Sequence, residues 1–200
     1  MLRRSVIIFT TITIGLVSFL RMILSKWAEA AAGLKLWQIS DSGVVWVRIL
    51  MYGEDVYSVT FSPDGKLLAS GNYYVKLWQV PDGHIVKTLE GTAPVAFSPE
   101  GKILATRWKD IVKLWDVTSG SLIRILQGET DQVTSIAFSP NGRLLALGSN
   151  NGIIKVWRVA NGNLIHTLKG HAGGVLSVTF SPDGQLLASG GGTKPSNCGR

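Results

Sequence analysis

Histidine, cysteine and paired carboxylates are the side chains that most often carry catalysis or bind metals, and this sequence spaces them far apart. Its histidines are His84, His166 and His171, and its single cysteine is Cys198. None of the histidines has a second histidine, a cysteine or a carboxylate at the spacing of a metal site. The carboxylates are scattered singly, so no pair sets its two pKa values apart for acid–base catalysis. We therefore predict no catalytic residue, no metal and no cofactor, and we expect that the protein is not an enzyme.

The net charge of +7 belongs mostly to the two ends of the chain. There, one acidic residue, Glu29, opposes six basic ones: Arg3, Arg4, Arg21, Lys26, Lys194 and Arg200. A surface that binds nucleic acid needs basic residues clustered on one face of a folded domain. We therefore expect no nucleic-acid partner. The single cysteine also excludes an intramolecular disulfide.

An apolar run follows the basic start of the chain and covers residues 5–24, with Arg21 as its one charge. As a helix it would span roughly 30 Å, about one hydrocarbon core. Lys26 and Trp27 follow it and favour an uncleaved single-pass anchor, since both side chains suit the membrane interface. A cleaved export signal ending near the Ala-Glu-Ala triplet at 28–30 and a soluble N-terminus are the alternatives. Basic residues flank the run on both sides, so the topology stays open.

One short turn sequence, Phe-Ser-Pro-x-Gly, recurs four times from residue 61 onward. Its prolines are 36, 41 and 42 residues apart, at Pro63, Pro99, Pro140 and Pro182. A second element, Lys-Leu-Trp or Lys-Val-Trp, recurs at intervals of 41, 37 and 42 residues, at Trp37, Trp78, Trp115 and Trp157. Two interleaved elements that keep one period indicate a structural repeat.

Each repeat reads as four short strands. The Ser-Pro-x-Gly segment suits a type I turn, with Ser first, Pro second and Gly fourth. The strand before this turn alternates large and small side chains, as in 133–138, so neighbouring sheets can stack on both of its faces. Four short antiparallel strands in every ~40 residues describe a propeller blade. We therefore predict an all-β fold of propeller blades, preceded by an N-terminal hydrophobic helix.

Residues 34–192 resemble the WD-repeat (beta-transducin-like) family of propellers. The literal Trp-Asp pair of that family stands at Trp115-Asp116, and its Gly-His pair at Gly170-His171. The resemblance implies a buried network of this His, an Asp six residues before the Trp, and a hydroxyl on the second strand. The Asp positions read Asn72, Lys109 and Asn151, and the hydroxyl positions read Ser70, Thr106, Leu147 and Ser189. The repeat residues Trp37, Trp78, Trp115, Asp116, Trp157, His171 and the four prolines are thus structural, in blades less stable than the family norm.

The repeat also divides the chain. Residues 1–33 form the anchor or signal segment with a short linker, 34–192 the repeat region, and 193–200 a C-terminal tail. Within the repeat region we predict a half-blade at 34–51, blades at 54–90, 91–128 and 129–169, and a half-blade at 172–190. The second blade is the weakest, because Pro94 falls in a shortened stretch where its innermost strand begins.

These elements amount to about four blades' worth of strands, which predicts an open or partial propeller. We expect an open fragment or truncated product first, a two-chain ring formed by self-association through the half-blades second, and a single-chain four-blade ring third. Half-blades at the ends would leave apolar side chains uncovered, among them Trp37, Trp46, Val178 and Phe180.

Every strong signal in the sequence serves the fold, and the function of a propeller lies on its loop faces. We predict a non-catalytic WD-repeat scaffold, membrane-associated through residues 5–24, that binds a protein or peptide partner on a propeller face. The alternative is an accessory or sensory propeller portion of a larger enzyme or signalling assembly whose catalytic part lies on another polypeptide.

Overall fold

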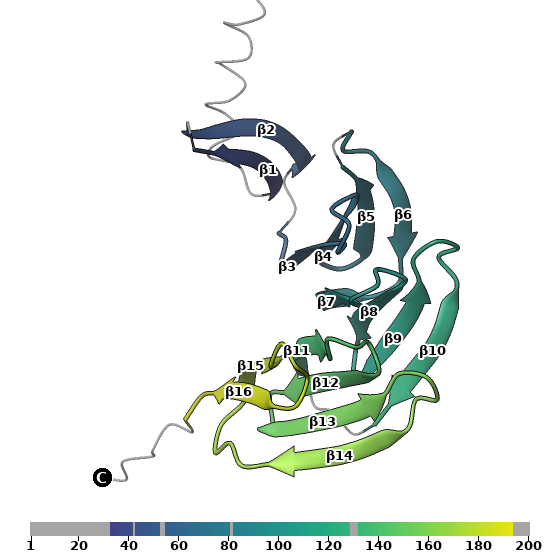
Figure 1. Cartoon of the computed structure of the whole chain (residues 1–200), viewed down its shortest axis with the longest axis vertical. Coiled ribbons are helices and arrows are strands. Elements are labelled where there is room, and N and C mark those ends of the chain that lie inside the picture. The colour runs from purple at the N-terminus through teal and green to yellow at the C-terminus, as the bar shows by residue number, and fades with distance from the viewer. Residues whose placement is uncertain (1–32, 42, 53–54, 81, 129–131, 194–200) are drawn as a thin grey trace, which may run out of the picture. The chain divides into compact units, whose positions relative to one another are not determined.

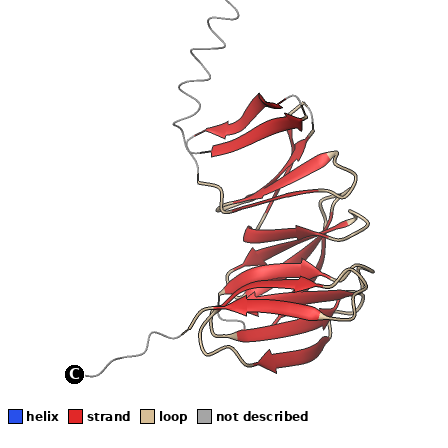
Figure 2. Cartoon of the chain, turned by 60° about the vertical axis from the view of Figure 1, so that its left-hand side comes forward, coloured by secondary structure: helices blue, strands red, loops and turns tan. Residues whose placement is uncertain are grey.

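The computed structural model of the chain describes residues 33–41, 43–52, 55–80, 82–128 and 132–193. This described part consists of strands and turns without a helix (Figure 2), which confirms the predicted all-β class. It therefore holds no helix with the length and apolarity that a membrane crossing requires. The expected anchor helix and residues 194–200 of the predicted C-terminal tail lie outside the described residues.

The chain divides into two units, residues 1–55 and 56–200, and each is described by itself. The first unit holds one antiparallel hairpin of β1 (Gly33–Ser40) and β2 (Gly43–Tyr52). Ser40 pairs with Gly43 at its tight end, and Trp37 pairs with Trp46 further along. The range predicted as a half-blade, 34–51, lies within this two-stranded hairpin.

The second unit holds, in its described residues, three four-stranded antiparallel sheets and one hairpin (Figure 1). Within each sheet the strands pair in sequence order. Blade 1 comprises β3 (Ser58–Phe61), β4 (Leu67–Gly71), β5 (Val75–Gln79) and β6 (Ile85–Leu89); blade 2 comprises β7 (Thr92–Phe97), β8 (Ile103–Trp108), β9 (Ile111–Asp116) and β10 (Leu122–Gln127). Blade 3 comprises β11 (Val133–Phe138), β12 (Leu144–Ser149), β13 (Ile153–Arg158) and β14 (Leu164–Lys169), and the hairpin comprises β15 (Val175–Phe180) and β16 (Leu187–Gly191).

The repeated Ser-Pro-x-Gly segment forms the turn between the first and second strand of each sheet. In blade 1 the Gly65 amide donates to the Ser62 carbonyl over 2.8 Å, and the Ser62 hydroxyl accepts from the Leu67 amide over 2.9 Å. Gly65 has a φ of +70°, a conformation that favours glycine. The same hydrogen bonds recur at Ser139 and Ser181. The serines therefore act in turns, as predicted.

The core lies between neighbouring sheets rather than within one. Leu77 and Leu89 of blade 1 pack in one cluster with Leu104 and Trp115 of blade 2. Blade 2 packs on blade 3 in the same way, through a cluster of Val112, Leu114, Leu126, Leu145, Leu147 and Trp157. Each sheet therefore needs a neighbour on both faces to bury its apolar side chains.

The expectation that Val178 and Phe180 are left uncovered is wrong. Val178 of β15 is 5% exposed and belongs to a cluster with Ile154 and Val156 of blade 3. Phe180 is half-buried against the same cluster. The reason is that β15 packs over β11 and β12, the first two strands of blade 3. The hairpin of β15 and β16 therefore suffices to cover this face of blade 3. Trp37, by contrast, is 47% exposed.

Pro94 lies inside β7, where the pairing with β8 is irregular. Thr92 pairs with Arg107 and Val95 pairs with Thr106, so the register shifts across the proline. A proline has no amide hydrogen for the ladder, and such an irregularity accommodates it. The strand then resumes, and the Val95 amide donates to the Ser58 hydroxyl of blade 1 over 3.3 Å.

Candidate functional site

The repeated tryptophans fasten the third strand of a blade to its second strand. In blade 1 the Trp78 Nε1 hydrogen is donated to the Ser70 Oγ over 2.8 Å, and in blade 2 Trp115 donates to the Thr106 Oγ1 over 2.9 Å. Both hydrogen bonds are buried. A buried indole N–H normally has such an acceptor, because leaving it without one costs free energy. These hydroxyls stand at the second-strand positions that the family resemblance implies, and here they accept from the tryptophan of the third strand.

Blade 3 has the tryptophan but not the hydroxyl. Leu147 occupies the position that Ser70 has in blade 1 and Thr106 has in blade 2. Each of these residues pairs with the lysine of its own third strand: Leu147 with Lys155, Ser70 with Lys76 and Thr106 with Lys113. The Trp157 Nε1 is buried and has no hydrogen-bond partner among the described residues. The Ser149 Oγ, two residues beyond Leu147, is likewise buried and without a partner there.

Two of the three residues at the family's Asp positions serve their own turns. The Asn72 side chain accepts a hydrogen bond from the Tyr74 amide over 2.9 Å, and the Asn151 side chain accepts one from the Ile153 amide over 3.2 Å. Lys109 lies in the corresponding turn of blade 2 with a φ of +54°. These side chains thus shape the turns between second and third strands.

The remaining predicted repeat residues also lie at turns or strand ends. Asp116 ends β9, and its Oδ1 accepts from the Ser119 amide over 2.7 Å and from the Ser119 hydroxyl over 2.8 Å. His171 lies before β15, with its Nε2 at 2.8 Å from the Ser189 Oγ of β16. His84 and His166 are exposed. The prolines Pro63, Pro99, Pro140 and Pro182 occupy the four Ser-Pro turns.

Strand direction gives each blade two different ends. The Ser-Pro turns and the turns between third and fourth strands lie at one end, and the turns between second and third strands lie at the other. Four aromatic residues of blades 1 and 2 gather at this second end, and we call it the aromatic end: Tyr57, Tyr73, Tyr74 and Trp108. The three tyrosines are between 56% and 73% exposed. Tyrosine and tryptophan contribute most to binding at protein interfaces.

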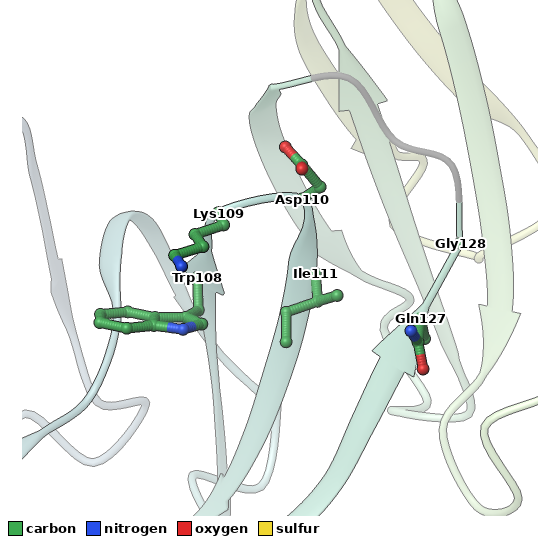
Figure 3. A pocket seen from close by; sticks show the side chains of 6 residues that line it. All are labelled: Trp108, Lys109, Asp110, Ile111, Gln127 and Gly128. Carbon is green, nitrogen blue, oxygen red and sulfur yellow. The ribbon is translucent and has the colours of Figure 1, made fainter.

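A pocket of about 580 Å³ opens beside Trp108 at the aromatic end. Besides Trp108 it is lined by Lys109, Asp110, Ile111, Gln127 and Gly128. Figure 3 shows the Trp108 ring on one side of Ile111 and Gln127 on the other. An apolar floor with a few polar groups at the rim is the usual composition of a site that receives a ligand or a side chain.

A buried lysine holds the Trp108 ring in place. The Lys113 side chain is 9% exposed, and its Nζ lies 2.6 Å from the Glu90 Oε2. The same Nζ lies 4.8 Å from the centre of the Trp108 ring and 5.7 Å from that of Trp115. A cation over an indole face is attracted by its π electrons. Trp108 therefore presents a fixed surface to the pocket.

A second, smaller pocket of about 270 Å³ lies at the same end between blades 1 and 2. Its lining includes Tyr57, Tyr73, Asn72, Thr92, Ala93 and Arg107. The Arg107 guanidinium is held by hydrogen bonds to two carbonyls, that of Lys109 over 3.3 Å and that of Val133 over 3.4 Å. The aromatic end thus combines tyrosine, tryptophan and arginine on a scaffold of strands.

The acidic residues with shifted pKa values are turn residues, not members of a reactive cluster. Hydrogen bonds from the Ser62 hydroxyl and the Lys66 amide lower the pKa of Asp64, and those from Ser181 and Gln185 do the same for Asp183. The Ser119 amide and hydroxyl lower the pKa of Asp116. Among the residues that the structure describes, no three His, Cys, Asp or Glu side chains group to hold a metal ion.

The aromatic end was not among the features predicted from the sequence. The signal that marks it is the pair Tyr73-Tyr74 and the single Trp108 at turns between second and third strands, where no core residue is needed. Their common location becomes visible only when the strands are paired and the blades stacked.

The stacked four-stranded sheets define the class of the protein as a β-propeller repeat protein. The family model described as WD domain, G-beta repeat matches residues 47–79, 120–158 and 162–194, together just over half of the 200 residues. The chain belongs to this WD40 family, as the sequence predicted. The matches leave out residues 80–119, which include Pro94 and most of blade 2. In the comparison with curated proteins, no match was found.

Proposed function

We propose that this protein is a non-catalytic scaffold, held at a membrane by residues 5–24, that binds a protein or peptide partner through the aromatic end. WD40 domains commonly bind protein partners, and the family supports this general role. The observation that carries the proposal is the exposure of Tyr57, Tyr73 and Tyr74 at the same end of the blades as the Trp108 pocket. Large aromatic side chains are seldom left on a surface in a group unless that surface is used.

The chemistry of the aromatic end supports binding rather than reaction. The Trp108 pocket contains one carboxylate, Asp110, and one exposed lysine, Lys109, without a nucleophile beside a base. The indole and phenol rings offer large rigid contact areas that lose little conformational entropy on binding. A partner segment with an apolar side chain for the Trp108 pocket and polar groups for its rim fits this surface.

A photo-crosslinking experiment on the full chain in its native membrane tests the binding surface. A photoreactive phenylalanine analogue at Tyr73 should give a discrete crosslinked protein, and Trp108→Ala should abolish it. The same analogue at Phe61, an exposed aromatic residue next to a Ser-Pro turn, is the matched control and should give none. Equal crosslinking at both positions, or crosslinking at Tyr73 that is insensitive to Trp108→Ala, would refute this binding surface.

Membrane tethering is tested separately. Carbonate-washed membranes should retain the full chain through residues 5–24, and a chain that lacks residues 1–32 should be released. Full-length protein with an intact N-terminus in the soluble fraction would contradict the tether. Self-association through the two incomplete sheets is the remaining part of the proposal.

A further inference from the structure

The two hairpins of the chain carry complementary halves of a blade. In sequence and pairing, β15 and β16 correspond to the first two strands of blade 1, with the Ser-Pro turn between them. The β1 strand carries the Lys-Leu-Trp sequence of a third strand, and β2 follows it as a fourth strand does. A four-stranded sheet in the order β15, β16, β1 and β2 would therefore have the same strand order as each of blades 1 to 3.

The register of the complete blades predicts which residues would meet. Trp78 lies opposite Leu68 on the second strand, and Lys76 lies opposite Ser70. Blade 2 repeats this register with its own tryptophan and hydroxyl. If β16 and β1 pair in the register of a second and a third strand, Trp37 lies opposite Leu187 and Lys35 lies opposite Ser189. Gly33 then lies opposite Gly191.

The hydrogen-bonding groups at this edge fit the same scheme. The Ser189 Oγ of β16 occupies the hydroxyl position of a blade and already lies 2.8 Å from the His171 Nε2. In blades 1 and 2 the equivalent hydroxyl accepts the indole hydrogen of the third strand. Trp37 is 47% exposed in its own unit, whereas Trp78 and Trp115 are buried in theirs. The hydroxyl and the indole that would pair thus stand on different hairpins.

We propose that two copies of this chain associate by blade complementation, with β1 of one copy pairing with β16 of the other at each of two junctions. At each junction the Trp37 Nε1 hydrogen is donated to the Ser189 Oγ of the second copy, and the Ser189 hydroxyl donates to its own His171 Nε2. Counted over the described residues, the assembly then has eight blades: three complete within each copy, and two composite ones, one at each junction. This inference rests on the self-association part of the proposed function and names its contact.

The packing of the blades favours a second copy over closure of one chain on itself. A self-closed ring of four blades turns each sheet by about 90°, and an eight-blade ring turns it by about 45°. Over a sheet roughly 14 Å wide, the outer strands of neighbours would diverge by roughly 20 Å in the first case and roughly 11 Å in the second. Outer strands here touch the next blade: Arg124 of β10 donates hydrogen bonds of 3.0 and 3.1 Å to the Ala160 and Asn161 carbonyls of blade 3.

Sedimentation equilibrium of the full chain in density-matched detergent measures this association directly. The wild-type protein should have twice the 21.6 kDa mass of the chain. Trp37→Phe and Ser189→Ala each remove the hydrogen bond at both junctions, so each should raise the dissociation constant about ten- to a hundredfold. Trp78→Phe and Ser70→Ala remove the same kind of bond inside blade 1. These matched controls should lower the melting temperature and leave the dissociation constant unchanged.

A mixing experiment separates two chains from one. Trp37→Asp and Ser189→Arg should each be monomeric alone, because both junctions of each homodimer are broken. In an equimolar mixture, the Ser189→Arg chain still has Trp37 and the Trp37→Asp chain still has Ser189. These two residues can form one intact junction, so the mixture should form a dimer. A chain closed on itself gains nothing from mixing.

A monomeric wild-type chain, a mixture that stays monomeric, or a dimer that Trp37→Phe and Ser189→Ala leave unchanged would each overturn the proposal. The carbonate wash and the Tyr73 crosslink do not depend on these junctions. A failure of blade complementation is therefore distinguishable from a failure of the scaffold function.

Discussion

Leu147 and Trp157 stand to each other in blade 3 as Ser70 and Trp78 do in blade 1, yet only the second pair is joined by a hydrogen bond. Trp78 donates to the Ser70 Oγ over 2.8 Å, whereas the buried Trp157 Nε1 has no partner among the described residues. Leu147 instead packs in the cluster between blades 2 and 3. Blade 3 thus has an apolar contact where blade 1 has a polar one.

This difference predicts unequal effects of the same substitution. Trp78→Phe and Trp157→Phe remove the same atoms, but only the first breaks a hydrogen bond and leaves the Ser70 hydroxyl buried without its donor. We expect Trp78→Phe to lower the free energy of unfolding by about 1–3 kcal/mol more than Trp157→Phe does. Denaturant unfolding of the two variants measures the difference, and equal losses would show that the hydrogen bond adds no net stability.

The Ser149 hydroxyl offers a stabilising substitution. It is buried without a hydrogen-bond partner among the described residues, and such a group costs about 1–3 kcal/mol relative to one exposed to water. Ser149→Ala removes the hydroxyl and leaves a void of one atom, so we expect a gain of up to about 1 kcal/mol. Thermal melts check the sign. Ser70→Ala is the opposite control and should destabilise, because Ser70 accepts from Trp78.

The Lys113–Glu90 ion pair predicts an asymmetry between its two partners. The Lys113 side chain is only 9% exposed, and Glu90→Ala removes the carboxylate that lies 2.6 Å from its ammonium group. We expect this substitution to lower the free energy of unfolding by about 1 kcal/mol. Lys113→Met removes the buried charge and keeps an apolar side chain beside Trp108, so it should cost less. Unfolding of both variants and of the double variant gives the coupling between them. A larger loss for Lys113→Met would mean that the contacts with Trp108 and Trp115 dominate.

The turn carboxylates predict a sensitivity to acid. Hydrogen bonds lower the pKa of Asp64, Asp116 and Asp183 in the folded protein, so each contributes stability that is fully present above the unfolded pKa of 3.8. This contribution is lost as the pH falls below 3.8 and through the lowered folded pKa. Asn141 makes the same turn contacts as Asp64, at 2.8 Å to the Ser139 hydroxyl and 3.0 Å to the Arg143 amide, without a charge.

We therefore expect that, as the pH falls below about 4, the melting temperature falls less steeply in a triple variant in which Asn replaces Asp64, Asp116 and Asp183. Melting curves across this window, compared with those of the wild type, provide the measurement. A decline that is unchanged in the triple variant would assign the acid sensitivity to other carboxylates.

The amino-acid sequence by itself determined the blades. A type I turn needs its Ser, Pro and Gly at fixed places, and a buried strand needs its alternation, so both leave a local pattern that repeats with the fold. The Ser62 turn and the Trp78 and Trp115 strands were predictable for this reason, whereas the hydroxyls of Ser70 and Thr106 were indicated by the resemblance to the WD-repeat family. Residues 1–32 carry an equally clear apolar pattern, but they lie outside the described residues, so the anchor stays a prediction.

Tertiary structure alone decided which surfaces are covered and which side chains gather. Val178 is buried because β15 lies on blade 3, and the aromatic end exists because Tyr57, Tyr73 and Trp108, far apart in sequence, reach the same end of two stacked sheets. Neither fact leaves a local pattern. Burial depends on how one sheet lies against the next, and that packing is a property of segments about 40 residues apart rather than of any one of them.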